Sequence, residues 1–341
     1  MEKMEWNDDK AKAIVQKHKK RFSWKLSFNV IRVLLGIVLV YAVYMISVSI
    51  IYDATNVGKR NEFYQKLAVD WTYPGYTSSI SVDSTNEINP LLTQKIEFPL
   101  IKIIGKEEFA ITKVSLNKPL IDSYSTTTVN EYFPYSSHKE FTFSLPYNPV
   151  TNVKLNETET PDVWNQLEHV HEGNVAQLAF SINDYSSPEE LLDLVSSYQV
   201  DVLWMPVYMG ELKNFTEGGW SGSENDITLA KPWGLAGFKH VDEDFNITYS
   251  TTNLNTETVK ESQEIMLKNM ERMLKEDKNL AETLLGTDYL QQRYDYLQKE
   301  GFQVYGAVVT GPVKQLLKLK EVGGVHNAKL GEIKPWNWIE Q

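Results

Sequence analysis

The side chains best suited to chemistry in this sequence are two histidines separated by one valine. They are His169 and His171, within Glu168-His169-Val170-His171-Glu172. Alternate residues of a strand point to the same face, so this spacing could present both imidazoles to one metal ion. A zinc site needs further ligands, and the surrounding polar stretch offers no obvious third one. We therefore interpret this stretch as an exposed loop and predict no metal.

Two other short patterns match catalytic or phosphate-binding motifs only in part. In Gly219-Trp220-Ser221-Gly222, the glycines do not have the spacing of the G-x-S-x-G nucleophile elbow. Val309-Thr310-Gly311-Pro312 predicts a strand-to-helix turn, but its proline removes one amide donor and no lysine stands at P-loop spacing. Acidic pairs such as Glu224 and Asp226 are interpreted as solvated. We predict neither an enzyme nor a cofactor.

The composition excludes further classes of chemistry. The chain of 341 residues has no cysteine, which excludes disulfides and thiol catalysis. Its net charge is −11, and the acidic balance lies after residue 32. This argues against direct contact with nucleic acid in that part of the chain.

An uncharged run of 20 residues, from 33 to 52, determines how the chain is organised. At 1.5 Å per residue, such a helix is about 30 Å long, the thickness of a bilayer's hydrocarbon core. We predict a transmembrane helix that includes Val33, Leu34, Leu35, Ile37, Val38, Leu39, Val40, Ile46, Ile50 and Ile51. A signal peptide cleaved near Ser49 and a buried helix of a soluble protein are the alternatives. The long basic lead and the apolar residues after Ser49 favour an uncleaved helix.

The charges on the two sides of this run differ in sign. Residues 1–32 contain nine basic and four acidic residues, a net charge of +5, whereas residues 33–341 carry −16. By the positive-inside rule, the amino terminus is cytoplasmic and the carboxyl-terminal part lies outside. We predict a single-pass protein of the cell membrane.

The segment before the apolar run has the pattern of an amphipathic helix. Its apolar positions recur every three or four residues, which places them on one helical face. They are Ala11, Ile14, Val15, His18, Phe22 and Leu26. Pattern alone favours a helix that lies on anionic lipid, with Trp24 at the interface. The alternative is a docking helix for a cytoplasmic partner.

After the apolar run, the pattern predicts a linker or a first helix, and then several strands. The linker would cover residues 53–75 and the helix residues 61–70, and a polar connection covers residues 151–173. Alternating or β-branched runs predict the strands. These strands cover residues 80–82, 96–104, 109–115 and 140–145.

From residue 175 the pattern alternates between strands and helices. Ser187, Pro188 and Glu190 have the types and spacing of a capping box with proline in the first turn. Two strand-helix-strand units predict a layered sheet with helices on one face. The predicted strands cover 175–182, 200–207 and 302–310. One predicted helix begins at residues 187–190, and the others cover 256–285, 289–299 and 312–319.

These elements predict an α+β protein. It has a single transmembrane helix and an extracytoplasmic domain of mixed sheet with helices, β-rich near the membrane. The predicted divisions are a basic cytoplasmic tail at 1–32, the transmembrane helix at 33–52, a membrane-proximal β-rich region at 53–160 and a carboxyl-terminal α+β domain at 161–341.

Three parts of the chain resemble one family of bacterial regulators. Tyr305-Gly-Ala-Val-Val-Thr-Gly-Pro-Val-Lys-Gln-Leu-Leu-Lys-Leu-Lys320, followed by residues 331–338, resembles the carboxyl-terminal domain of sigma factor regulators. Residues 175–207 resemble the beginning of that domain. Trp6-Asn7-Asp8-Asp9-Lys10-Ala11-Lys12, with the basic stretch and apolar run after it, resembles the family's amino-terminal segment. These regulators are membrane anti-sigma proteins of Bacillus-like Gram-positive bacteria.

The resemblance implies a protein that holds an extracytoplasmic-function sigma factor at the membrane. It would release this factor when the outer domain meets cell envelope stress, and it leaves open a second membrane protein in the signal path. The tail would contact the sigma factor, with lysines facing acidic partner surface. The candidate contacts are Trp6, Ile14, Val15, Lys17, Lys19, Lys20 and Phe22.

A different class of function remains as the alternative. The chain would be an anchored envelope protein that binds a ligand or the cell wall and has no cytoplasmic signalling role. In that case the tail only sets the topology, and an unrelated basic segment would replace it without effect.

Overall fold

The computed structural model describes residues 8–78, 84–119, 126–131, 141–157, 161–223 and 225–338. Their contacts divide the chain into two compact units, Met1–Thr55 and Asn56–Gln341. The protein is α+β, with an apolar amino-terminal helix followed by a β-rich domain. This confirms the predicted fold class. The predicted boundary between 53–160 and 161–341 falls at residues outside the described ranges, and it stays a prediction.

The first unit is one helix. Helix α1 (Asp8–Ala54) contains 47 residues, and at 1.5 Å per residue it is about 70 Å long. No proline interrupts it, and its one glycine, Gly36, is tolerated within a long run of good helix formers. The predicted tail helix and the predicted transmembrane helix are therefore parts of one element.

The second unit begins with a buried helix. Asn56 adopts a left-handed conformation, with φ 51°, between α1 and helix α2 (Val57–Thr72). The predicted helix at 61–70 is confirmed and extends by a turn at its start. Eleven of the 16 residues of α2 are buried, including Tyr64, Leu67 and Trp71.

Beside α2 lies the first sheet, which is antiparallel. Its strands are β1 (Tyr76–Ser78), β2 (Thr85–Ile88), β3 (Thr93–Ile104), β4 (Glu107–Pro119) and β5 (Thr126–Glu131), in the order β1-β3-β4-β5, with β2 also paired to β3. The predicted strands at 96–104 and 109–115 are confirmed. The predicted strand at 80–82 lies outside the described residues. Ile96, Phe98 and Val114 share one buried cluster with α2.

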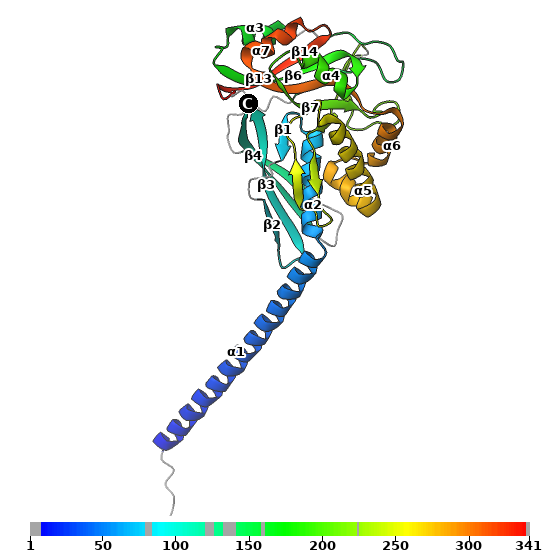
Figure 1. Cartoon of the computed structure of the whole chain (residues 1–341). Helices are drawn as coiled ribbons and strands as arrows, with labels where there is room; N and C mark the ends of the chain where they lie inside the picture. The colour runs from blue at the N-terminus through cyan, green and yellow to red at the C-terminus, as the bar shows by residue number, and fades with distance from the viewer. Residues whose placement is uncertain are drawn as a thin grey trace, which may run out of the picture. The chain divides into compact units, whose positions relative to one another are not determined.

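The second sheet has five antiparallel strands. They are β6 (Asn174–Ser186), β7 (Asp201–Tyr208), β10 (Trp233–Ala236), β13 (Gln303–Pro312) and β14 (Val325–Pro335), in the order β10-β7-β13-β6-β14. Three of these strands were predicted. Strand β14 was not, because it is an edge strand whose register with β6 shifts twice, so that its residues do not alternate regularly. Figure 1 shows this sheet beyond the carboxyl end of α2.

Short helices cover one face of the second sheet. They are α3 (Pro161–His169), α4 (Pro188–Val195) and α7 (Val313–Lys318), which is followed by the 3-10 turn η1 (Leu319–Glu321). The capping box of α4 is confirmed: Glu190 N donates to Ser187 Oγ, and Ser187 N donates to the Glu190 carboxylate. Helix α3 corrects the prediction of a purely polar connection, since Trp164 and Leu167 are buried three residues apart.

An irregular segment and a hairpin cover the other face. The predicted strand at 140–145 is wrong for the described residues 141–145, which form only one isolated bridge, from Ser144 to Thr228. The segment lies over the sheet rather than at its edge, so its backbone has no ladder to join. Phe141, Phe143 and Leu145 are nevertheless buried, which explains their alternation. The hairpin is β8 (Trp220–Ser223) with β9 (Asp226–Leu229), where sequence indicated a glycine-rich loop.

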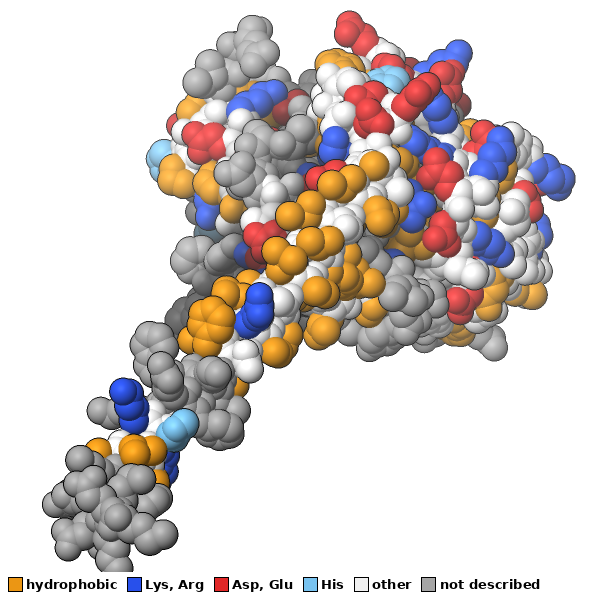
Figure 2. Space-filling model, turned by 90° about the horizontal axis from the view of Figure 1, so that it is seen from below, with side chains coloured by type: hydrophobic (Ala, Val, Ile, Leu, Met, Phe, Trp, Pro, Cys, Tyr) orange, Lys and Arg blue, Asp and Glu red, His pale blue; other side chains and the backbone are white. Residues whose placement is uncertain are grey.

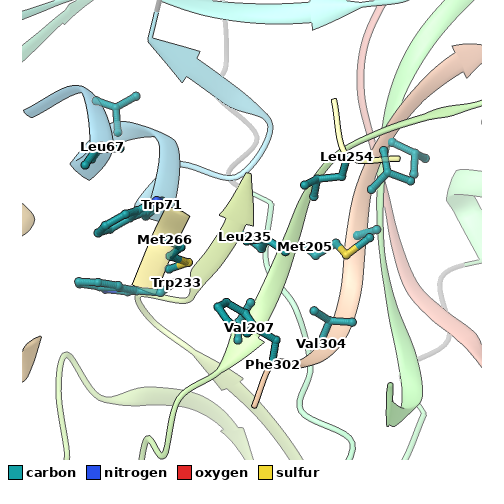
Figure 3. Packing of buried hydrophobic residues seen from close by; sticks show 14 of the residues in the cluster. Leu67, Trp71, Met205, Val207, Trp233, Leu235, Leu254, Met266, Phe302 and Val304 are labelled. Atoms are coloured by element: carbon teal, nitrogen blue, oxygen red, sulfur yellow. The ribbon is translucent and has the colours of Figure 1, made fainter. Parts of the chain in front are cut away.

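Two longer helices complete the unit. Helix α5 (Val259–Leu285) bends at Asp277, whose carboxylate accepts from Leu280 N at 3.0 Å and so caps the second half. Helix α6 (Leu290–Glu300) follows it. A small hairpin of β11 (Lys239–Val241) and β12 (Ile247–Ser250) contacts the start of α2 through its turn. Met266 from α5 meets Trp71 from α2 and Trp233 from β10 in the shared core (Figure 3).

Four buried hydrogen bonds join the chain at α2 and the first sheet to the second sheet. Gln177 Nε2 donates to Gly75 O at 3.1 Å and to Ile103 O at 2.9 Å. Thr310 Oγ1 accepts from Gly105 N at 2.7 Å. Trp204 Nε1 donates to Asp70 O at 3.1 Å. The carboxyl ends of α2 and β3 therefore meet the second sheet together.

Buried ion pairs also hold elements of the second unit together. Asp70 pairs with Lys239, and each side chain is only 2% exposed. Arg293 from α6 pairs with Glu211 and, at 2.7 Å, with Glu217, while its guanidinium lies 4.5 Å from the ring centre of Trp233. A buried charge that loses its partner is costly, so these pairs hold their elements in one arrangement.

We expect Asp70→Asn to destabilise the second unit strongly. The ammonium of Lys239 would stay buried without a counter-charge, at a cost of about 3–5 kcal/mol. The measurement is urea unfolding of the solubilised protein, followed by tryptophan fluorescence. The control is Glu271→Gln, because Glu271 and its partner Lys275 are 45% and 71% exposed. An equal, small effect of both variants would show that the buried pair does not stabilise the fold.

The pairing of Glu97 predicts a pH dependence. Hydrogen bonds from Lys113 and Lys95 lower the pKa of Glu97 from 4.5 to about 2. The unfolded chain takes up this proton near pH 4.5, whereas the folded chain takes it up only near pH 2. The stabilisation is therefore present above pH 4.5 and declines as the pH falls toward 2. We expect the difference in unfolding free energy between the unaltered protein and Glu97→Gln to shrink over this range in urea titrations. A difference that stays constant would contradict the assignment.

Candidate functional site: the amino-terminal helix

The predicted contact residues of the tail lie on α1, as far as the structure describes them. Ile14 and Val15 are 58% and 64% exposed, and Lys17 and Lys19 are also exposed. Lys20 and Phe22 belong to the helix, but their side chains are outside the described part. Trp6 lies outside the described residues altogether.

The helical register decides which described tail side chains lie together. At 100° per residue, positions 11, 14, 15 and 18 fall within an arc of about 100°. Ile14 and Val15 provide the apolar surface of this arc. Lys19 borders the arc, and Lys17 lies well outside it. The tail therefore presents an apolar strip with cations beside it, which is the pattern of a helix that docks in a groove.

The part of α1 after the tail is apolar on every side. Among the described residues, one helical segment, Ser27–Ala54, is long and apolar enough to cross a membrane, and an 18-residue stretch of it has a mean hydropathy of 2.5. The ten predicted transmembrane residues are each 55–68% exposed. Figure 2 shows hydrophobic side chains along α1, with Lys, Arg and His toward its amino end. A continuous apolar surface of this size is characteristic of contact with lipid or protein.

The hydroxyl groups at the carboxyl end of α1 are satisfied within the helix. Ser47 Oγ donates to Val43 O at 2.8 Å, and Thr55 Oγ1 donates to Ile51 O at 2.8 Å. Polar groups in a hydrocarbon environment need such internal partners, because no water is present to bind them. These bonds make the segment compatible with lipid despite its serine and threonine.

The junction after α1 was not predicted from the sequence. Only Thr55 and Asn56 separate α1 from α2. Asn56 Nδ2 donates to Asp244 Oδ1 at 2.6 Å, and Lys59 Nζ donates to Asn246 Oδ1 at 2.9 Å. The turn between β11 and β12 therefore holds the start of α2. A glycine or asparagine between two helical patterns is the signal that could have revealed this junction.

The two histidines are exposed, as predicted, but they do not share one loop and do not lie on a strand. His169 ends helix α3, where its Nδ1 lies 2.7 Å from Asn165 O, and His171 Nδ1 accepts from Gly173 N at 3.0 Å in the following turn. Within the described ranges, no group of three or more His, Cys, Asp or Glu side chains is arranged to hold a metal ion.

The patterns around Ser221 and Thr310, which matched catalytic or phosphate-binding motifs in part, have no such role in the fold. Ser221 is exposed on strand β8 of a hairpin, not on a strand-to-helix turn. Thr310 is buried, donates to Ala176 O at 2.9 Å and accepts from Gly105 N, so its hydroxyl joins the two sheets. Neither site gathers the base or donors that catalysis requires.

Comparison with known proteins identifies the family. Residues 12–109 match the model described as "Sigma factor regulator N-terminal", and residues 167–332 match "Sigma factor regulator C-terminal". A Bacillus subtilis (strain 168) protein named "Probable anti-sigma-M factor YhdL" is 24% identical over 288 residues, covering 82% of this chain and 70% of that protein. No solved structure matches the chain. Both ends of this chain match models of one regulatory, non-catalytic family, and the chain belongs to the sigma factor regulators.

Proposed function

We propose that this chain is a single-pass membrane anti-sigma factor. Its tail binds an extracytoplasmic-function sigma factor in the cytoplasm, α1 crosses the membrane, and residues 56–341 respond to envelope stress outside. The observation that carries the proposal is α1 itself: an exposed amphipathic tail continues without a break into a helix that is apolar on every side.

The length of the tail helix supports binding in a groove. From Asp8 to Arg32 the helix has 25 residues and is about 38 Å long. A stable interface buries roughly 800 Å² on each partner. One short helix cannot reach this area by end-on contact, but a helix of this length can when it lies along a groove. The partner would thus offer an apolar groove with acidic edges, opposite Ile14, Val15 and the flanking lysines.

The charges support the orientation. Basic residues precede the apolar part of α1, and the chain after it is strongly acidic. Cytoplasmic flanks of transmembrane helices carry such an excess of Lys and Arg. This charge difference supports a tail in the compartment of the transcription machinery and a second unit outside. The sigma factor, rather than this chain, would contact DNA.

The arrangement of α2 supports a role in signalling. Helix α2 follows α1 after two residues and is buried among the first sheet, α5 and β10. A change in the packing of the second unit would therefore alter the contacts of α2, the helix that follows α1 in the chain. Release of the sigma factor would follow from such a change or from a second membrane protein that recognises it.

The first test is recovery of the partner. Protein tagged at the carboxyl terminus is purified from gently solubilised membranes, beside a variant that lacks residues 2–22. We expect a sigma factor with the full tail and none with the shortened one. If neither form recovers a sigma factor while both are intact and inserted, the chain acts only outside, as an anchored envelope protein. A membrane protein recovered with both forms would identify a partner of the second unit.

The second test concerns the apolar strip of the tail. We expect Ile14→Ala with Val15→Ala to weaken the complex by about 2 kcal/mol, roughly 30-fold in Kd, because contact residues at interface centres each contribute at least about 1 kcal/mol. The amount of sigma factor recovered per tagged chain measures this. Val30→Ala with Ile31→Ala is the matched control, an exposed pair on the same helix that lies at the start of the apolar segment. If both pairs have the same effect, the strip is not the contact.

A further inference from the structure

The turn between β2 and β3 carries an exposed apolar tip. It consists of Pro90, Leu91 and Leu92, between Asn89 and Thr93. Leu91 is 85% exposed, the largest value among the exposed large hydrophobic side chains of the described residues. No residue from 88 to 93 is charged. Single exposed leucines are common on protein surfaces, so exposure alone does not indicate a binding site. The location of the tip in the fold is the observation that matters.

The backbone of the turn is held in one conformation. The Asn89 side-chain oxygen accepts from Leu91 N at 2.9 Å and from Thr93 N at 3.0 Å. Leu92 N also donates to Asn89 O at 3.0 Å, and Leu92 has a left-handed φ of 57°. The tip is therefore presented as a preformed surface, and little conformational entropy is lost when it binds.

Hydrogen bonds place this turn at the amino end of α2. Near that end, Asn61 Nδ2 donates to Gln94 Oε1 at 2.6 Å, and Gln94 Nε2 donates to Gly58 O at 3.1 Å. At the opposite end, Gln177 binds Gly75 O and Ile103 O together. Strand β3 and helix α2 thus run side by side in the same direction, as Figure 1 shows.

The tip lies near the level at which α2 begins. Gln94 already contacts Gly58 O, one residue after the first residue of α2. Three residues separate Gln94 from Leu91, and they span at most about 10 Å, less here because Leu92 is not extended. Leu91 therefore lies close to the start of α2.

The start of α2 is tied to the apolar segment by covalent bonds. The segment ends at Ala54, and Asn56 follows two residues later, within about 8 Å of chain. This step rests on the proposed function, in which that segment spans the membrane. The amino end of α2, and the turn beside it, then lie at the outer surface of the bilayer.

We propose that the Pro90-Leu91-Leu92 tip inserts into the outer membrane interface, with lipid as its partner. The uncharged tip can enter the interface without desolvating a charge. A second turn at this end, among the described residues, is Asp-Glu-Asp at 242–244 and opposes binding to anionic lipid. The tip therefore acts by apolar insertion, and zwitterionic phosphatidylcholine is sufficient. The second unit is then attached to the membrane in two ways: by the covalent connection between α1 and α2, and by the inserted tip.

The absence of cysteine allows a direct test. Leu91→Cys in the full chain is labelled with an environment-sensitive dye and reconstituted in phosphatidylcholine vesicles. We expect emission at shorter wavelength and quenching by lipids that carry a nitroxide at shallow depth, about 5–10 Å below the headgroups. Because Leu91 is exposed, its replacement removes no core contact.

Two further sites provide the controls. Val150→Cys carries the same dye at a side chain that is 73% exposed. It lies in the segment whose Tyr147 stacks on Tyr185 of β6, in the sheet at the far end of α2. Ile46→Cys reports the apolar segment itself.

Each pattern of quenching at the three labelled positions either supports or contradicts insertion of the tip. Quenching at Ile46→Cys and Leu91→Cys, with none at Val150→Cys, supports insertion of the tip. If Ile46→Cys is quenched and Leu91→Cys behaves as Val150→Cys does, the tip does not insert, while the membrane anchor stands. If Ile46→Cys is itself accessible to water, the proposed membrane span fails, and tip insertion fails with it.

Discussion

The arrangement of the second unit depends on one buried residue, Asp70, near the carboxyl end of α2. Its carboxylate accepts hydrogen bonds from Lys239 Nζ of β11 and from the backbone and hydroxyl of Ser78 in β1. Its carbonyl oxygen accepts from Trp204 Nε1 of β7. Four elements from distant parts of the sequence therefore meet at a single residue. Since an ionised carboxylate is tolerated in a dry core only when it is fully paired, none of these elements can move away alone without a large cost.

The rest of α2 has both paired and unpaired buried polar groups. Near its start, Asn61 donates to Gln94, and Gly58 O accepts from Gln94. The side-chain oxygens of Asn61 and Gln65, however, are buried and accept no hydrogen bond from the described residues. Each unsatisfied buried polar atom costs about 1–3 kcal/mol relative to a paired one. Part of the first half of α2 is therefore packed at a cost, whereas the carboxylate of Asp70 near its carboxyl end is paired.

Sequence predicted the elements whose residues alternate with a regular period or carry a strong cap. The apolar part of α1, strands β6, β7 and β13, and helix α4 belong to this group, and Ser187 and Glu190 form the predicted capping box. Strand β14 and helix α3 were missed because each is half exposed, so tertiary contacts rather than pattern decide their structure. The segment at 141–145 shows the limit of the method. Its alternation correctly indicated burial on one side, but burial against a sheet face and pairing within a sheet produce the same pattern.

The candidate site was predictable for a different reason. Ile14 and Val15 have no folded neighbours among the described residues that could override their local helical pattern, so the exposed strip can be derived from spacing alone. The junction at Asn56 and the tip at Leu91 could not be derived in this way. Their positions follow from hydrogen bonds between residues far apart in sequence, such as Gln94 with Gly58 and Asn61. Local pattern therefore identifies the exposed strip of the tail, whereas only the fold identifies which parts of the second unit lie nearest the start of α2. The proposed function draws on both: a tail whose apolar strip is complete in itself, and a second unit whose packing includes the helix that follows α1 along the chain.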